Sequence, residues 1–254
     1  MDEHIPVITS VASGKGGVGK TFVTINLAAL LASKGKRVLA VDCDLGLANM
    51  DIMLGLDPAF TLKDVIFGGS TIRDAIIRTK AGFDLIAGSS GVKEMAQPLY
   101  EKIQLIKDAL KPLFQSYDYV ILDTGAGISE MVLQFNLLAY RNIVVLNREL
   151  TSLTDAYAMI KVMYQIFARD SFSVVVNSTV NEKEGSRIFS QIDNTCRKFL
   201  GFSLEYLGCI TSDQAVPRSI IKQEVLAVST PQSVVAKDCQ RIAHNICSWE
   251  AACY

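Results

Sequence analysis

The clearest chemical signature of the chain is a glycine-rich run, GKGGVGKT, over residues 14–21. The run fits the pattern G-x-x-x-x-G-K-[ST] and lies between a strand-like segment and a helix-like one, as a phosphate-binding loop must. Glycines let the backbone curl until its N–H groups point at phosphate oxygens, and the positive end of the following helix adds to the attraction. Lys20 is then expected to reach the β- and γ-phosphates, and the Thr21 hydroxyl to bind Mg²⁺. The predicted nucleotide contacts are the loop and the start of the next helix: Gly14, Lys15, Gly16, Gly17, Val18, Gly19, Lys20, Thr21 and Phe22.

Two apolar runs that end in carboxylates belong to the same predicted site. Asp42 and Asp44 follow the run at 38–41, and Asp123 follows the run at 119–122. Neighbouring parallel strands end at the same edge of a sheet, so these carboxylates are expected to converge beside the phosphate loop. Asp123 is the candidate for holding Mg²⁺, directly or through a water molecule. An aspartate that forms a turn after a strand is common, but two such strands in this order favour the nucleotide site.

Strand-like and helix-like segments alternate along the chain and would position the loop and the carboxylates. Short apolar runs without period-2 alternation are typical of strands buried on both faces. They occupy residues 7–11, 38–41, 119–122, 143–146, 173–176 and 204–210. Helical stripes of apolar residues lie within 23–31, 99–113, 156–167 and 235–249. The pattern predicts an α/β fold: a doubly wound, mainly parallel sheet with helices on both faces, formed as a single domain over residues 1–254.

Composition disfavours several classes of protein. Of the 254 residues, 50% are apolar and 20% are charged, which is too apolar for a disordered chain. The formal net charge of −1 argues against attraction of the whole surface to nucleic acid or anionic lipid, and no direct nucleic-acid binding is expected. None of the six cysteines forms a CxxC pair, so zinc, iron–sulfur and dithiol redox sites are disfavoured. We expect no membrane-spanning segment and no signal peptide, and hence a cytoplasmic protein.

Lys15 adds information that a generic phosphate loop does not carry. With it, KGGVGKT is a deviant Walker A motif, and the chain resembles the MinD/ParA class of P-loop ATPases. The resemblance implies that Lys15 reaches across an ATP-bound homodimer to the phosphates of the other copy. It also implies that Asp42 supports the metal ion from behind its ligands, that Asp44 positions the attacking water and that Asn177 contacts adenine. For Asn177 a turn at the strand end is the alternative. By this resemblance the catalytic residues are Lys15, Lys20 and Asp44, and the metal residues are Thr21, Asp42 and Asp123.

Three longer motifs are similar to those of FlhG/FleN proteins, which are MinD-like ATPases that limit flagellar number. They are DCDLGLANMDIMLGL at 42–56, DTGAGI at 123–128 and TSLTDAYAMIK at 151–161. The similarity implies a switch that binds ATP/ADP with Mg²⁺, dimerises with ATP, hydrolyses it slowly and regulates flagellar number, placement or gene expression. The implied partners are a flagellar transcription activator and an FlhF-like GTPase, which would recruit the protein to the cell pole or the inner face of the membrane.

Two departures from the family pattern concern the surroundings of the nucleotide base or the dimer face. Glu149-Leu150 stands where Glu-Pro is usual, and Thr211-Ser212-Asp213 stands where Pro-x-Asp is usual. The main alternative function is a ParA/MinD-type partition or division-site positioning ATPase, and a DNA-binding partition protein would need a basic patch. A reductase of the nitrogenase iron-protein type would need cluster-binding cysteines near its switch loops, where only Cys43 lies.

Several other segments carry expectations. The irregular stretches 43–58 and 87–98 follow strands and are predicted to form binding loops. The tail after Ile246 has no cation, which disfavours an autonomous membrane-binding helix and makes Trp249 a closing residue of the core. On the helix predicted over 154–168, four side chains are expected outside the core, as a partner-binding face or an ordinary solvated one: Asp155, Tyr157, Lys161 and Tyr164.

Overall fold

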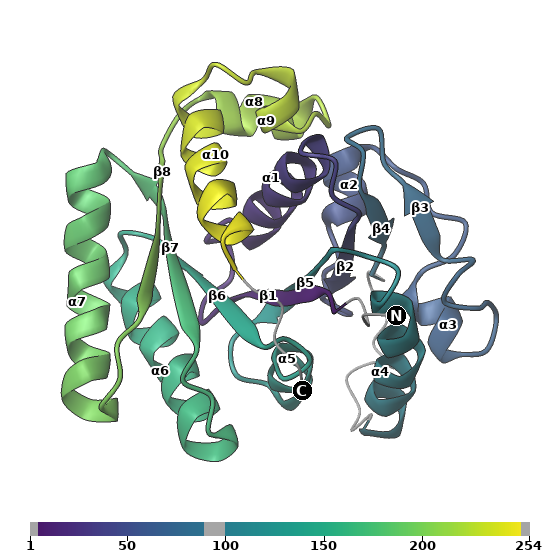
Figure 1. The fold of residues 1–254 in the computed structure, drawn as a ribbon, viewed down its shortest axis with the longest axis horizontal. Coiled ribbons are helices and arrows are strands. Elements are labelled where there is room, and N and C mark those ends of the chain that lie inside the picture. Colours follow the sequence, from purple (N-terminus) through teal and green to yellow (C-terminus); the bar gives the residue numbers. More distant parts are fainter. Residues whose placement is uncertain (1–4, 89–99, 250–254) are drawn as a thin grey trace.

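The computed structural model describes residues 5–88 and 100–249, which fold around one eight-stranded sheet (Figure 1). In their order across the sheet, the strands are β3 (Ile76–Arg78), β4 (Asp84–Ile86), β2 (Val38–Cys43), β5 (Tyr119–Ala126), β1 (Val7–Ser13), β6 (Arg141–Leu146), β7 (Phe172–Thr179) and β8 (Glu205–Thr211). Neighbouring strands run parallel except β3 and β4, which are antiparallel. The strands that lead to the glycine-rich loop and to the carboxylates, β1, β5 and β2, are therefore adjacent at the centre of the sheet.

Helices cover both faces of this sheet (Figure 1). They are α1 (Lys20–Ser33), α2 (Met50–Leu54), α3 (Leu62–Ile66), α4 (Tyr100–Phe114), α5 (Glu130–Asn136), α6 (Leu150–Phe167), α7 (Glu182–Leu200), α8 (Ala215–Ile221), α9 (Leu226–Ser229) and α10 (Val234–Cys247). On β2, Val38 and Ala40 pack in the core with α1 and α10, whereas Leu39 and Val41 pack in the core with α4 and α5. This alternation is the two-residue period of a strand buried on both faces. The predicted doubly wound α/β fold is confirmed.

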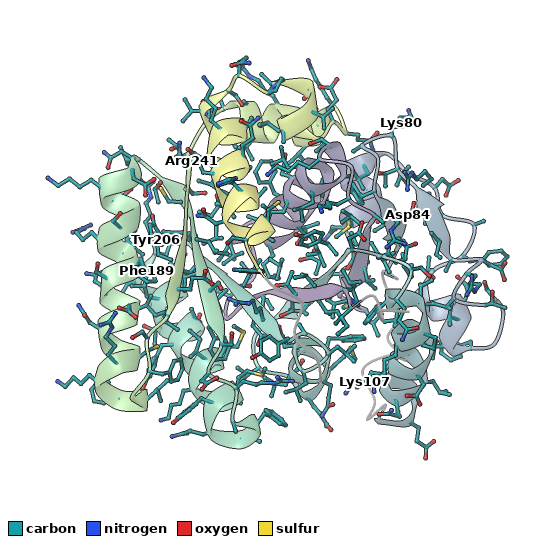
Figure 2. The ribbon with its side chains drawn as sticks, in the orientation of Figure 1. Lys80, Asp84, Lys107, Phe189, Tyr206 and Arg241 are labelled. Atoms are coloured by element: carbon teal, nitrogen blue, oxygen red, sulfur yellow. The ribbon has the colours of Figure 1, made fainter. Side chains whose placement is uncertain are left out.

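Two backbone groups of the outer strand β8 form hydrogen bonds with side chains of α10. Asn245 Nδ2 donates to the Leu207 carbonyl at 3.0 Å, and the Thr211 N–H donates to Asp238 Oδ2 at 2.8 Å. Arg241 of α10 pairs with the first residue of α7, Glu182, at 3.7 Å. Figure 2 labels Arg241 there, with Tyr206 of β8 and Phe189 of α7 below it. Unpaired backbone groups at a sheet edge can pair with a strand of another chain. Asn245 and Asp238 occupy two of these groups on β8.

The structure differs from the sequence-based expectations in two places. The antiparallel strands β3 and β4 have three residues each, too few for an apolar run to stand out. The stretch expected to be irregular at 43–58 contains the short helix α2, while most of the other, 87–98, lies outside the described residues.

The expectation for α6 was wrong for its two tyrosines. Tyr157 and Tyr164 are partly buried against the core between α6, α7 and the sheet, and the Tyr164 ring lies 4.9 Å from that of Phe202. Lys161 is exposed and Asp155 is half-buried. The rings of Tyr157 and Tyr164 lie beside the apolar stripe of α6 and bury further apolar surface. The buried face of the helix is therefore wider than the stripe alone.

The expectation for Trp249 is confirmed, because its side chain is 7% exposed within the core that α1 and α10 share. None of the helices among the described residues has the length and apolar character needed to cross a bilayer.

Candidate functional site

The glycine-rich loop connects β1 to α1 and is fastened from two sides. Gly19 has the left-handed φ of 93° that ends the loop and caps α1. The Asn177 amide donates to the Val18 carbonyl at 2.7 Å and lies so close to Gly19 that a side chain there would collide with it. On the other side, Ser13 Oγ donates to the Lys15 carbonyl at 2.7 Å. These contacts fix the shape of the loop, which suits it to bind phosphate oxygens.

The first glycine of the loop touches α6. A Cβ atom on Gly14 would fall well inside van der Waals distance of the Asp155 backbone carbonyl. A Cβ on Gly16, by contrast, would meet nothing within 4 Å. The loop therefore needs glycine at position 14 because α6 packs directly on its backbone.

Asp42 and Asp123 lie side by side beneath the loop. They are paired in the register of β2 and β5, and only 1% and 2% of their surfaces are exposed. Asp42 accepts hydrogen bonds from the backbone N–H groups of Asp44, Asn49 and Met50, each at 3.1 Å. The predicted convergence of the two strand ends is therefore present.

The surroundings of Asp123 come from the start of α1. Its carboxylate accepts hydrogen bonds from the hydroxyls of Thr21 and of Thr24, the latter at 3.3 Å, and it feels the charge of Lys20. These three side chains lie on the first turns of the helix that follows the loop.

Burial makes both carboxylates reluctant to ionise. It raises the pKa of Asp42 to about 7, with a further rise from the neighbouring Asp123 charge, against which the three backbone N–H groups act. It raises the pKa of Asp123 to about 6, while the hydrogen bonds from Thr21 and Thr24 and the positive charge of Lys20 oppose the rise. Two carboxylates in one low-dielectric place disfavour each other's charge. A cation would relieve this repulsion.

The donor set fits Mg²⁺. A buried carboxylate beside a threonine hydroxyl offers the oxygen ligands that this ion prefers, and Mg²⁺ takes its remaining ligands from phosphate and water. Over residues 5–88 and 100–249, no three His, Cys, Asp or Glu side chains form a group that could hold a metal by themselves. The residues therefore fit a metal that arrives with phosphate rather than a protein-enclosed ion.

An open cleft of about 850 Å³ lies on the loop. Its lining includes Lys20, Thr21 and Phe22 from the loop side and residues 43–47 from the segment after β2. Within that segment, Asp44 Oδ1 accepts hydrogen bonds from the N–H groups of Gly46 and Leu47 at 3.3 and 3.0 Å. Asp44 is thus fixed at the wall of the cleft.

Lys15 is held by α6. Its ammonium group forms an ion pair with Glu149, the residue that precedes α6, and donates to Thr151 Oγ1 at 3.0 Å. The hydrogen bond from Lys15 and its positive charge lower the pKa of Glu149. Because the two charged side chains are 38% and 54% exposed, this pair is screened by solvent and can be exchanged for another partner.

The structure brings most of the predicted site residues together. The later part of the loop and Asp44 line the cleft, and Asp42 and Asp123 are neighbours at the ends of β2 and β5. Gly14 and Lys15 contact α6 and the residue before it instead. Val18 and Phe22 have buried side chains, so their contribution to phosphate binding is limited to backbone groups. Asn177 lies against the loop, with its oxygen bonded to the Ser178 N–H at 2.8 Å.

Sequence reasoning missed the parts played by Thr24 and Glu149. Thr24 follows Thr21 by three residues on α1, so a helical-face argument could have found it. Nothing in the sequence near Glu149 indicates Lys15 as its partner.

Comparisons with known proteins show which proteins the chain is similar to. A family model described as AAA domain matches residues 7–174. The chain is 35% identical over 246 residues to the antiactivator FleN of Pseudomonas aeruginosa, covering 97% of this chain and 88% of that protein. It is 28% identical over 237 residues to the flagellum site-determining protein YlxH of Helicobacter pylori, with 92% and 79% covered. The solved structure of the septum site-determining protein MinD complexed with Mg-ADP, from Pyrococcus horikoshii, matches with a TM-score of 0.79 and 25% identity, over 96% of this chain and 97% of that one.

The packing of Gly14 on α6 predicts a stability effect. Gly14→Ala should lower the free energy of unfolding by about 1–3 kcal/mol, because the new methyl group must displace the start of α6. Gly16→Ala is the matched control, since its methyl group enters open space. Urea unfolding without nucleotide measures both variants. Equal stability of the two variants would contradict the assigned contact.

The buried carboxylates predict a pH effect. The pKa of Asp123 is about 6 in the folded chain against 3.8 as a free side chain, so unfolding releases a proton between these values and rising pH favours unfolding. When the pH is raised from 5 to 8, the free energy of unfolding should therefore fall by about 1 kcal/mol less in Asp123→Asn than in the parent protein. Urea unfolding in the presence of a chelator is the measurement. Identical pH slopes would show that Asp123 ionises as it does in an unfolded chain.

Proposed function

The chain belongs to the MinD/ParA class of P-loop ATPases and is FlhG/FleN-like, and on this premise we propose that it is an ATP-dependent switch that regulates the number or position of flagella. The observation that carries the proposal is the phosphate loop set above two buried carboxylates, Asp42 and Asp123, at an open cleft. The proposed reaction is Mg²⁺-dependent hydrolysis of ATP to ADP and phosphate.

Charge and position support a role for each polar residue of the cleft. Lys20, the first residue of α1, binds the β- and γ-phosphates together with the backbone N–H groups of the loop. Thr21 and Asp123 would hold the metal ion, and Asp42, which is paired with Asp123 in the strand register, would support them. Bound Mg²⁺ supplies positive charge that offsets the negative charge of the reacting phosphates. Asp44, fixed at the cleft wall, orients the attacking water.

Lys15 is the reason for proposing that the protein forms a dimer. In the family to which the chain belongs, the matching lysine binds the nucleotide of the second copy. In a single chain Lys15 pairs with Glu149 and Thr151, so dimerisation requires that it leave both. We propose that this exchange accompanies formation of a homodimer with ATP at its interface. The adenine contact of Asn177 belongs to the same proposal.

The names of the relatives support a flagellar role, since one is an antiactivator and another a flagellum site-determining protein. The proposed partners are a flagellar transcription activator and an FlhF-like GTPase, which bring a cytoplasmic protein to the cell pole or the inner face of the membrane. The likeness to the MinD structure favours division-site positioning as the second candidate. Deletion of the gene separates the two: altered flagellation with normal division supports the first, and misplaced septa support the second.

The first test of the nucleotide site is the loss of Lys20. Lys20→Ala should weaken ADP binding by about 10–100-fold, because phosphate loses a charge-assisted hydrogen bond. Asp44→Ala should bind ADP like the parent protein but lose ATP hydrolysis. Lys36→Ala, in the exposed turn after α1, is the control for loss of a lysine. Titration with a fluorescent nucleotide gives the affinities, and unchanged binding by Lys20→Ala would refute the site.

The second test concerns Lys15 and Glu149. In an Asp44→Ala background that preserves ATP, the protein should be a dimer by light scattering, and adding Lys15→Ala should leave it monomeric. Adding Glu149→Gln instead should shift the dimer to lower protein concentration, since the competing ion pair is lost. A dimer that persists without Lys15 would rule out its proposed role between the two copies.

A further inference from the structure

Gln223 adopts a backbone conformation that its residue type disfavours. It lies between α8 and α9 and has a φ of 56°, one of three positive values found at non-glycine residues in the described part of the chain. A left-handed conformation costs a residue with a long side chain on the order of 1 kcal/mol, so other contacts must hold it. Its own N–H donates to the Ile220 carbonyl at 3.0 Å, which closes α8 but does not require a glutamine side chain.

The Gln223 side chain reaches α2. Its Nε2 donates to the Ile52 carbonyl at 3.0 Å, although the two residues are 171 positions apart in the sequence. The same amide packs on Gly55, the left-handed residue that ends α2, where a Cβ atom would lie 2.6 Å from Gln223 Oε1. The C-terminal end of α2 is thus fastened to the α8–α9 connection.

The other end of α2 is fastened to the nucleotide site. The N–H groups of Asn49 and Met50 donate to Asp42 Oδ2. With five residues, α2 is too short to be stable through its own hydrogen bonds, so its position depends on these end contacts and on the packing of Met50, Met53 and Leu54 against the core. Ile52 and Met53 of α2, with Ile220 of α8, line the nucleotide cleft.

From this arrangement we infer that Gln223 is a positioning residue for the ATPase site: its bond to the Ile52 carbonyl sets the place of α2, and thereby that of the Asp42 carboxylate and of the loop that carries Asp44. The inference rests on the proposed ATPase function. The phosphate loop is built from other elements, so Gln223 should affect hydrolysis far more than the binding of ADP.

Two substitutions separate positioning from stability. Gln223→Gly removes the side-chain bond but also removes the unfavourable φ, so this variant should unfold no more easily than the parent protein. Gln223→Glu keeps the length of the side chain and replaces the donor by an acceptor that repels the Ile52 carbonyl. Gln240→Glu, an exposed change on α10, is the matched control for the added charge.

In both Gln223 variants, kcat for ATP hydrolysis should fall about five-fold or more, the worth of one net hydrogen bond, while ADP affinity stays within about two-fold. Hydrogen exchange of the α2 amides should be faster in both, and Gln240→Glu should match the parent protein in every respect. If the parent protein hydrolyses ATP and the two Gln223 variants keep its kcat and its α2 exchange rates, the inference is wrong. If the parent protein neither binds nor hydrolyses ATP, the proposed function itself fails.

Discussion

Two carboxylates are buried in this protein at the ends of adjacent strands, and the surrounding groups stabilise them with hydrogen bonds and a positive charge. Asp42 and Asp123 are almost fully buried, so water cannot solvate their charges. The start of α1 offers Asp123 two hydroxyls and a lysine charge, and the segment after β2 offers Asp42 three backbone N–H groups. Even so, the pKa of each carboxyl remains raised. The two carboxylates therefore favour a positive charge beside them.

A network of buried polar contacts fixes the position of β5 relative to the neighbouring strands. Ser10 Oγ donates to Asn136 Oδ1 at 2.6 Å and accepts from Asn142 Nδ2 at 2.7 Å. Asn136 donates to Thr124 Oγ1 at 3.4 Å, and this hydroxyl donates to the Val11 carbonyl at 3.2 Å. The network joins β1, β5, β6 and α5 directly after Asp123. Because each member is buried, shifting one strand would leave polar groups without partners, which ties the position of Asp123 to the rest of the sheet.

The exchange of partners that we propose for Lys15 involves an exposed polar contact and not this buried network. Lys15 is held by an ion pair with Glu149 in which both side chains are exposed to solvent. Exposed pairs of this kind are weak and exchangeable, whereas the buried carboxylates are costly to move. A nucleotide-controlled switch requires a rigid phosphate site beside groups that can change partners. Ligand binding can then move a group such as Lys15 to a new partner without unfolding the core.

The sequence by itself determined the phosphate loop, the buried central strands and the two acidic strand ends. These features depend on residues that are neighbours in the chain, such as the order of glycine, lysine and threonine before a helix, or on a short period of apolar residues. The short strands β3 and β4 escaped detection for the same reason, because three residues give no period. The two tyrosines of α6 were misplaced because the width of a buried helix face depends on which elements pack against it.

Only the tertiary structure decided which distant residues meet. Asn177 supports the loop at Val18, and Glu149 occupies Lys15. Gln223 closes the far end of α2. Each of these contacts joins segments more than 130 residues apart, and each is made by a polar side chain that would be unremarkable on a free surface. Local pattern cannot indicate such partners, because they are set by the order of strands in the sheet and by the way the helices pack across it.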